Sequence, residues 1–321
     1  NRHIRARSAQ RRPTGRAAGP AAIPAASALV ALWALPPFQL LTSNISLLTT
    51  SILAWYERHG RDLPWRRTRD PYHILVAEVM LQQTQVDRVL PKYAQWLEAF
   101  PTLRALAEAP ASDVIRLWAP LGYNGRAVRL QQIARQCNGQ MPASFDELLA
   151  LKGVGRYTAG AIACFAYGQQ VAFWDTNVRR VLTRLVRGAE VDLSERELEQ
   201  LATEALPAGQ AYDWHQALMD LGATICTSRK PRCDRCPAMD SCAAHPAILF
   251  GERPLRLVAE RKAAYTAQRF ETTNRYFRGR VVDALRQRSP LTLDELADVL
   301  GRQDAVWLDR LITGLERDGL L

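Results

Sequence analysis

Apolar residues recur at helical spacing through most of the chain. The pattern predicts helices over 46–59, 71–83, 86–99, 102–108, 111–119, 125–138, 144–151, 156–167, 175–187, 194–205 and 211–222. Few stretches alternate with the period of two that a half-buried strand requires. No internal repeat that would indicate a solenoid or propeller is present. The sequence therefore predicts an all-α fold.

Local signals place several helix ends. Ser144 with Glu147, and Thr292 with Glu295, have the spacing of a capping box, in which the first side chain and the last one satisfy free backbone N–H groups. Proline and glycine mark the joints between segments, at Pro101, Pro110, Gly122 and Pro142.

Residues 1–45 differ from the rest of the chain. A basic stretch precedes an Ala/Pro-rich segment at 21–41, which is interrupted by Pro24, Pro36 and Pro37. This apolar run is too short and too broken for a membrane helix. We expect a disordered extension or a mis-assigned start, with a targeting segment as the alternative.

The C-terminal part divides into three regions. A cysteine-rich turn spans 226–242 and closes a helical domain over 46–245, a polar linker covers 246–269, and a tail occupies 270–321. The apolar pattern of the tail predicts helices over 274–287, 293–300 and 304–317, an order that resembles a winged-helix unit. A wing hairpin would begin at 318–321, where the sequence ends.

Composition narrows the class of protein. The 321 residues are 48% hydrophobic and 23% charged, which excludes a collagen, a coiled-coil rod, a disordered chain and a polytopic membrane protein. The net charge is +10, but six arginines lie within residues 1–20. The remainder is only mildly basic, so charge alone is weak evidence for a nucleic-acid partner.

Four cysteines form a cluster with the spacing C-x6-C-x2-C-x5-C: Cys226, Cys233, Cys236 and Cys242. A chain with its own core has little need of disulfides between such close cysteines. Structural zinc accepts four thiolates, usually as two separated C-x2-C pairs. The single compact loop favours a [4Fe–4S] cluster, whose four irons each take one thiolate. The cations of the same loop, Arg229, Lys230 and Arg232, are candidate DNA phosphate contacts.

Residues 151–155 (LKGVG) have the form of a helix-hairpin-helix turn. Gly153 and Gly155 allow tight backbone geometry, Val154 is expected to enter the core, and a helix begins near Arg156. Free N–H groups at that helix N-terminus can hold a DNA phosphate without reading sequence. Lys152 lies where it can make a further phosphate contact. Asp175, eighteen residues after Tyr157, is a candidate helix cap with a fixed direction.

These pieces together resemble the endonuclease III superfamily of helix-hairpin-helix DNA glycosylases, and within it the MutY-type adenine DNA glycosylases. The similarity covers about residues 50–245. It is carried by the four cysteines and by residues 63–66 (LPWR), 78–86 (EVMLQQTQV), 121–123 (LGY), 153–160 (GVGRYTAG) and 175–178 (DTNV). The resemblance implies two helical lobes with double-stranded DNA across the cleft.

The resemblance also implies roles for single residues. Glu78 matches the catalytic acid, Asp175 the carboxylate that stabilises the sugar cation, and Tyr157 their neighbour in the pocket. Gln82 and Gln83 match the wedge that enters the duplex, and Tyr123 an aromatic near the opposing damaged guanine. The remaining matches are Arg66 as a DNA contact, with Gln216 and Trp65 as base-recognition residues.

The residue types suit the reaction independently. Breaking an N-glycosidic bond requires a proton on the departing purine and leaves an oxocarbenium-like sugar, so one protonated and one ionised carboxyl group are needed. Ile74, Leu75 and Leu81 adjoin Glu78 on its predicted helix, and an apolar wall raises the pKa of a carboxyl group. Asp175, at a helix N-terminus, is expected to stay charged.

Lysine scarcity bears on the reaction type. Only Lys92, Lys152, Lys230 and Lys262 occur, and Tyr157 stands where the bifunctional relatives place a Schiff-base lysine. We therefore predict a monofunctional glycosylase that leaves an abasic site. The expected substrate is double-stranded DNA with adenine opposite 8-oxoguanine or guanine. We expect a monomer without membrane contact, in the cytoplasm and associated with the nucleoid.

Three positions depart from the family pattern. Thr176 follows Asp175 where many adenine glycosylases have glycine, and Asn124 replaces a frequent second aromatic residue. The 270–321 tail is too short and too helical to be the sheet-rich domain that reads 8-oxoguanine. Two alternatives follow: a T·G or U·G mismatch glycosylase of the same superfamily, or a non-catalytic iron–sulfur DNA-binding factor.

Overall fold

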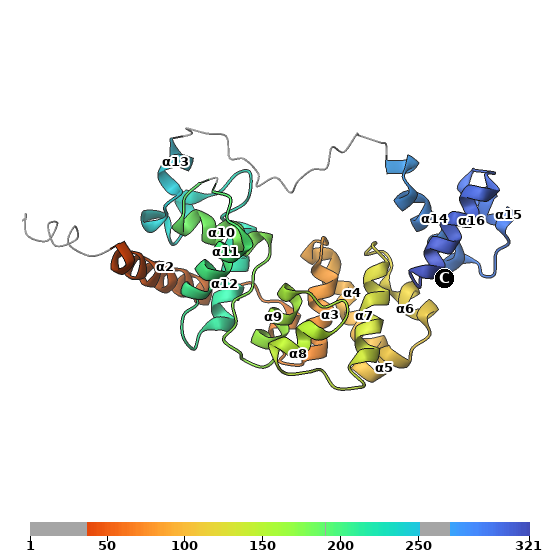
Figure 1. Ribbon diagram of the computed structural model, residues 1–321, viewed down its shortest axis with the longest axis horizontal. Coiled ribbons are helices and arrows are strands. Elements are labelled where there is room, and N and C mark those ends of the chain that lie inside the picture. The colour runs from red at the N-terminus through yellow and green to blue at the C-terminus, as the bar shows by residue number, and fades with distance from the viewer. Residues whose placement is uncertain (1–36, 190, 251–269) are drawn as a thin grey trace, which may run out of the picture. The chain divides into compact units, whose positions relative to one another are not determined.

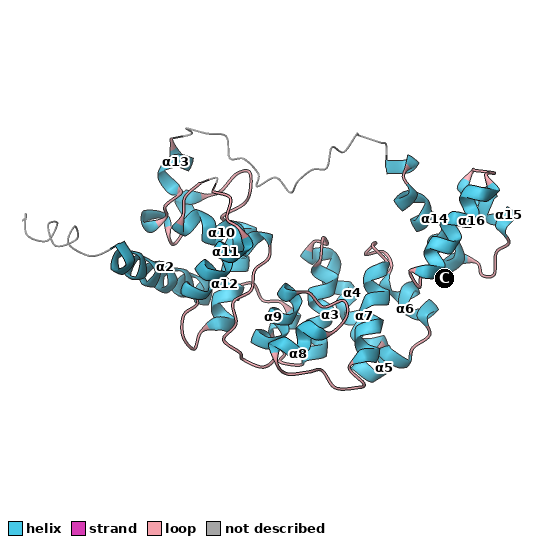
Figure 2. Cartoon of the chain, in the orientation of Figure 1, coloured by secondary structure: helices cyan, strands magenta, loops and turns pink. Residues whose placement is uncertain are grey.

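The computed structural model describes residues 37–189, 191–250 and 270–321, in which helices are joined by loops and no strand occurs (Figure 2). The all-α prediction is thereby confirmed. The extension before residue 37 and most of the expected linker, 251–269, lie outside the described residues. Within the described part of the chain, no helix has both the length and the apolar character needed to cross a bilayer.

The first group of helices follows the predicted segments closely. They are α3 (Pro71–Leu81), α4 (Val86–Ala99), α5 (Leu103–Glu108), α6 (Ala111–Trp118), α7 (Gly125–Gln136), α8 (Phe145–Ala150) and α9 (Arg156–Phe165). Helix α3 packs against α4, α7 and α9 (Figure 1). Its residues from Ile74 to Met80 are all buried, as expected for a helix that is surrounded by others.

A second core gathers α2 (Pro37–His59), α10 (Thr176–Val186), α11 (Glu195–Glu204) and α12 (Ala211–Thr224). Helix α10 packs against α11 and α12, and the cysteine-rich turn adjoins the same core. Helix α2 begins at Pro37, nine residues before the predicted helix 46–59. Helix α13 (His245–Leu249) occupies the start of the expected linker.

The tail contains α14 (Asn274–Gln287), α15 (Leu293–Leu300) and α16 (Ala305–Arg317), each in contact with the other two. Its apolar residues form a third core with Ile115 of α6 and Val128 of α7. Arg286 reinforces this contact by donating to the Ile115 carbonyl at 2.7 Å. The tail therefore lies against the α6–α7 region.

Side-chain caps explain why the helices begin where they do. The capping boxes of Ser144 with Glu147 and Thr292 with Glu295 are confirmed, and Ser194 with Glu197 forms another that the sequence reading overlooked. Helix α3 ends at Leu81, two residues earlier than predicted, because Gln82 leaves the helical backbone with a ψ of 111° and Gln83 then adopts a φ of 57°. That left-handed conformation cannot continue a right-handed helix.

Candidate functional site

Glu78 lies in the middle of α3 and is only 6% exposed. Burial raises the pKa of its carboxyl group to about 7, because the apolar surroundings disfavour the charged form. The Asp175 charge raises it further, while hydrogen bonding with Tyr157 and the Arg66 charge act in the opposite direction. The predicted upward shift is confirmed, so Glu78 can carry a proton near neutral pH.

Asp175 is held differently, as the N-cap of α10. Its Oδ1 accepts from the backbone N–H of Asn177 at 2.9 Å and of Val178 at 2.8 Å. Its Oδ2 accepts from the Asn177 side-chain amide at 3.0 Å. Three N–H donors and a helix N-terminus thus face one carboxylate, an arrangement that stabilises negative charge.

Tyr157, near the start of α9, lies beside both carboxyl groups. Desolvation raises the pKa of its hydroxyl well above the usual range, and the charges of Glu78 and Asp175 add to that effect. The Tyr157 hydroxyl thus lies close to Glu78, with which it shares a hydrogen bond, and near Asp175, although the three residues come from α3, α9 and the N-cap of α10. The structure therefore brings together the three predicted catalytic residues.

Close packing within the first core brings the segment before Asp175 against α9. A Cβ on Gly160 of α9 would lie 2.5 Å from the Phe173 Cβ, so only glycine fits there. The Phe173 ring also meets Tyr157 edge-on, with centroids 5.6 Å apart. Phe173 lies two residues before Asp175, so this contact limits how near Asp175 comes to α9.

His215 of α12 was not singled out from the sequence. It is buried, stacks on Phe173 with centroids 3.8 Å apart, and its Nε2 lies 3.0 Å from the Val171 carbonyl. Burial lowers the pKa of its imidazole to about 4, so the ring is neutral at physiological pH. His215 thus supports the segment that carries Asp175, without adding charge.

Helix α10 also supports the cysteine loop. Arg180 donates to the Cys226 carbonyl at 2.8 Å and to the Asn177 side-chain oxygen at 2.8 Å. Arg184 donates to the carbonyls of Thr227 at 2.8 Å and Ser228 at 3.0 Å. The helix that presents Asp175 therefore holds the start of the loop in place.

All four loop cysteines are free thiols and half-buried, and three of them pack against the second core. Burial raises the pKa of Cys236 to about 12, and the other three loop cysteines lie near enough to raise it further. In the described part of the chain, no group of three or more His, Cys, Asp or Glu side chains is arranged to hold a single metal ion. A four-iron cluster spaces its thiolates more widely than one ion does.

The 151–155 turn has the geometry expected of the hairpin. Gly153 has a φ of 98°, Val154 is buried, and the Val154 N–H donates to the Leu151 carbonyl at 3.0 Å. Gly155 precedes α9 without a side-chain cap, and no atom would lie within 4 Å of a Cβ there. Lys152 is exposed, and its ammonium has no partner among the described residues.

Gln82 and Gln83 form the turn after α3, and Tyr123, 45% exposed with a φ of 52°, lies in the loop before α7. Arg126 holds both segments. Its guanidinium donates to the carbonyls of Met80 at 3.0 Å and Gly122 at 3.2 Å, and to the Gln82 carbonyl. The sequence offered one signal for this residue: Arg126 shares a helical stripe with Leu130, Ile133 and Ala134, where an apolar residue is expected.

Two predicted contact residues have other partners. Arg66, predicted to contact DNA, is 8% exposed and pairs with the buried Asp220 at 2.7 and 2.8 Å. Its two terminal nitrogens donate to Asp220 and to the Arg61 carbonyl, and its Nε is buried, so the guanidinium is not available to a phosphate. Trp65, predicted to recognise a base, is 7% exposed and packs edge-on against Tyr93 in the first core.

The remaining predicted residues keep free polar groups. Gln216 of α12 is 5% exposed, and its amide makes no hydrogen bond with the described residues. Arg229, Lys230 and Arg232 are exposed on the cysteine loop, and their charged groups have no partner within the described ranges. All four are thus free to meet a ligand.

Two carboxyl groups in contrasting surroundings, together with a helix-hairpin-helix turn, are the features expected of enzymes that act on glycosidic bonds in DNA. Residues 76–208 match the HhH-GPD superfamily of base excision DNA repair proteins. The sequence is 42% identical over 284 residues to an adenine DNA glycosylase of Mycolicibacterium smegmatis, covering 86% of this chain and 93% of the relative.

Two further comparisons agree. An adenine DNA glycosylase of Mycobacterium tuberculosis is 43% identical over 281 residues, covering 85% of this chain and 89% of the relative. The solved structure of a thermostable thymine-DNA glycosylase superposes with a TM-score of 0.60 and 31% identity, covering 64% of this chain and 97% of that one. The chain belongs to the adenine DNA glycosylase family, so it is a base excision repair DNA glycosylase whose partner is DNA.

Proposed function

We propose that this enzyme removes adenine that is paired with 8-oxoguanine or guanine, and that Glu78 is its general acid. The observation that carries the proposal is the buried carboxyl group of Glu78, whose pKa near 7 leaves it substantially protonated at neutral pH. We take adenine as the excised base because both mycobacterial relatives are named adenine DNA glycosylases.

The proposed reaction is a hydrolysis in two stages. Glu78 gives its proton to a ring nitrogen of the adenine, and the bond between C1′ and the base breaks with its electron pair leaving on the purine. The sugar becomes an oxocarbenium ion next to the Asp175 carboxylate, whose negative charge stabilises it. Water then adds to C1′ and loses a proton to a carboxylate, leaving free adenine and an abasic site.

The same residues argue against strand cleavage by the enzyme. Schiff-base chemistry requires an amine at the sugar carbon, and the side chain beside Glu78 and Asp175 is the Tyr157 phenol, which cannot form an imine. Lys152 lies on the exposed hairpin, where its ammonium suits a phosphate contact. The proposed enzyme is therefore monofunctional.

The proposed DNA contacts divide into backbone and base contacts. The N–H groups of Gly153 and Gly155 and the cations Lys152, Arg229, Lys230 and Arg232 would hold phosphates. Adenine must leave the base stack to reach Glu78, and Gln83 with Gln82 would fill the gap. Tyr123 would stack near the opposing base, and the unpaired amide of Gln216 would face the adenine.

A panel of duplexes tests the substrate. Purified enzyme is incubated with A·8-oxoG, A·G, T·G and U·G duplexes, and each sample is divided between alkali and no treatment. We expect cutting of the first two, only after alkali. Cleavage of T·G or U·G alone would instead favour the mismatch thymine or uracil glycosylase, to which the thermostable relative and Thr176 point. Nicking without alkali that Lys152→Ala abolishes would contradict the monofunctional assignment.

We further infer that the four loop thiols hold a [4Fe–4S] cluster, which when bound would cross-link the loop. The donor set supports this: four free, half-buried cysteines adjoin one core, and Arg184 places its guanidinium 3.5 Å from the Cys226 sulfur. Cys236→Ser should reduce bound iron and sulfide and the visible absorbance of the purified protein. Cys164→Ser, in the first core, is the matched control and should keep both.

We propose a monomer acting on mismatched double-stranded DNA in the cytoplasm, near the nucleoid. Size-exclusion chromatography with light scattering, with and without a duplex, tests the stoichiometry. One chain per duplex is expected, and two chains on one lesion would contradict it.

A further inference from the structure

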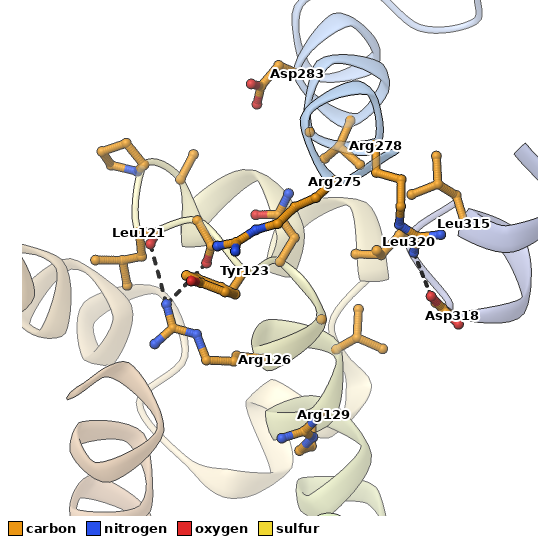
Figure 3. Close-up of a pocket in the computed structure, with 18 of the residues that line it drawn as sticks. Leu121, Tyr123, Arg126, Arg129, Arg275, Arg278, Asp283, Leu315, Asp318 and Leu320 are labelled. Carbon is orange, nitrogen blue, oxygen red and sulfur yellow. Dashed lines mark hydrogen bonds and ion pairs between the residues drawn. The ribbon is translucent and has the colours of Figure 1, made fainter. Parts of the chain in front are cut away.

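A cavity of about 1330 Å³ separates the 119–129 segment from helix α14 of the tail (Figure 3). Seven arginines line it, against two acidic residues, Asp283 and Asp318. Arginine's planar guanidinium matches the geometry of a phosphate group. We call this cavity the tail groove.

Most of the arginines are already engaged. Arg286 pairs with Asp283, and Arg278 donates to Asp318, which Arg317 also approaches. Arg126 is occupied by backbone carbonyls, and Arg88 donates to the Pro120 carbonyl. Both acidic residues of the groove are therefore already paired with arginines, Asp283 with Arg286 and Asp318 with Arg278.

Arg129 and Arg275 are the exceptions. Both are exposed, and neither makes a hydrogen bond or an ion pair with the described residues. Arg129 comes from helix α7 of the glycosylase domain and Arg275 from the first turn of α14 in the tail, so the two arginines without an acidic partner extend into the groove from opposite sides (Figure 3). Such a pair suits a polyanion that passes between them.

The groove is continuous with the surface already proposed to contact DNA. The Arg275 guanidinium lies over the Tyr123 ring, 4.0 Å from its centroid. At the other end, the Arg129 side chain lies against Gly153 of the hairpin, with its Cγ 2.8 Å from where a Cβ would be. The free cations thus extend a line that begins at the hairpin and passes Tyr123.

We propose that the tail groove binds the sugar–phosphate backbone of the strand opposite the excised base, with Arg129 and Arg275 as its phosphate contacts. The tail would then be one wall of the substrate site. This inference rests on the proposed function, because it takes the duplex to pass Tyr123.

The experiment measures DNA binding by the full chain carrying Glu78→Gln, which prevents base release. Affinity for an A·8-oxoG duplex is measured by fluorescence anisotropy over a series of KCl concentrations. The logarithm of the affinity falls as the logarithm of the salt concentration rises, and each lost phosphate contact makes this slope shallower by about 0.9. Arg129→Ala and Arg275→Ala should each show that loss, and Arg275→Lys should keep the slope because it keeps the charge.

Arg302→Ala is the matched control. Arg302 is also an exposed tail arginine stacked on an aromatic ring, 4.2 Å from the Trp307 centroid, but it does not line the groove. Its removal costs the same charge and should leave the slope unchanged. Thermal unfolding verifies that every variant is folded.

Wild-type slopes in both alanine variants, or equal losses in all three including Arg302→Ala, would overturn the proposal. Tighter binding by Arg275→Ala would also overturn it, because Arg275 would then be competing with DNA for Tyr123. These outcomes are separate from the duplex panel: release of adenine with unchanged salt slopes contradicts the tail groove alone, whereas no base release by the wild-type protein contradicts the proposed function.

Discussion

Glu78 and Asp175 bring the same functional group into two different surroundings. Glu78 is in the interior of α3, among apolar side chains that offer little to a charge. Asp175 is at the first turn of α10, where three N–H donors face its oxygens. The difference shows how one site obtains both an acid and a stable anion from two carboxyl groups.

The two regions also differ in what holds them. The Glu78 region depends on helix packing within the first core, with α3 between α4, α7 and α9. The Asp175 region depends on polar contacts: Arg180 joins Asn177 to the Cys226 carbonyl, and Arg184 holds the next two residues of the loop. Substitutions in the two regions should therefore reduce activity and stability for different reasons: lost packing around Glu78 and lost polar contacts around Asp175.

The largest effect is expected for Glu78→Gln. The amide keeps the size of the side chain but cannot supply the proton, so the rate of base release should fall by roughly 10²- to 10⁴-fold. Single-turnover kinetics on an A·8-oxoG duplex measure the rate, and anisotropy should show that binding is retained. An unchanged rate would remove Glu78 from the mechanism.

Asp175 requires two substitutions to separate charge from capping. Asp175→Asn keeps a good N-cap but loses the negative charge, so base release should fall by roughly 10²- to 10³-fold at nearly unchanged stability. Asp175→Ala should lose the same activity and also about 1 kcal/mol of unfolding free energy. If the asparagine variant remained active, the role of Asp175 would be the cap alone.

The pH dependence of stability should distinguish the two regions further. The Glu78 pKa is raised from 4.5 to about 7 in the folded protein, so folding favours its protonated form. This stabilising contribution is complete below about pH 4.5 and is lost as the pH rises through 7, amounting to about 3 kcal/mol.

Chemical denaturation between those pH values measures this loss, with Glu78→Gln as the reference. The amide does not titrate, so the variant should become more stable than the wild type above pH 7 and should match it near pH 4.5. A constant difference between the two proteins would contradict the raised pKa.

The smallest effect is expected where the two regions meet. Gly160→Ala places a methyl group against Phe173, and overpacking of this kind typically costs about 1–3 kcal/mol. Because Phe173 precedes Asp175, the rate of base release should also fall. Gly125→Ala is the control, since no atom lies within 4 Å of that Cβ position. Equal free energies of unfolding for the two variants would show that Phe173 can move away from α9 without cost, and would contradict the tight packing at Gly160.

Local interactions made much of the fold predictable. The helices lie where the apolar pattern predicts them. The capping boxes at Ser144 and Thr292 were predictable because each partner is only three residues away. Asp175 was predictable as a cap for the same reason. The shifted pKa of Glu78 also followed from its neighbours on one helix, because an apolar run on both sides of a residue indicates a helix that is buried all round.

Only the tertiary structure decided the partners of Arg66, Arg126 and Arg275. Arg66 meets Asp220, 154 residues further along the chain, and Arg126 meets carbonyls of a turn more than 40 residues earlier. Arg275 reaches Tyr123 from the tail. An arginine has the same sequence signature whether it binds DNA, a buried aspartate or a ring, because its partner is set by which distant segments the packing brings within hydrogen-bonding or stacking distance.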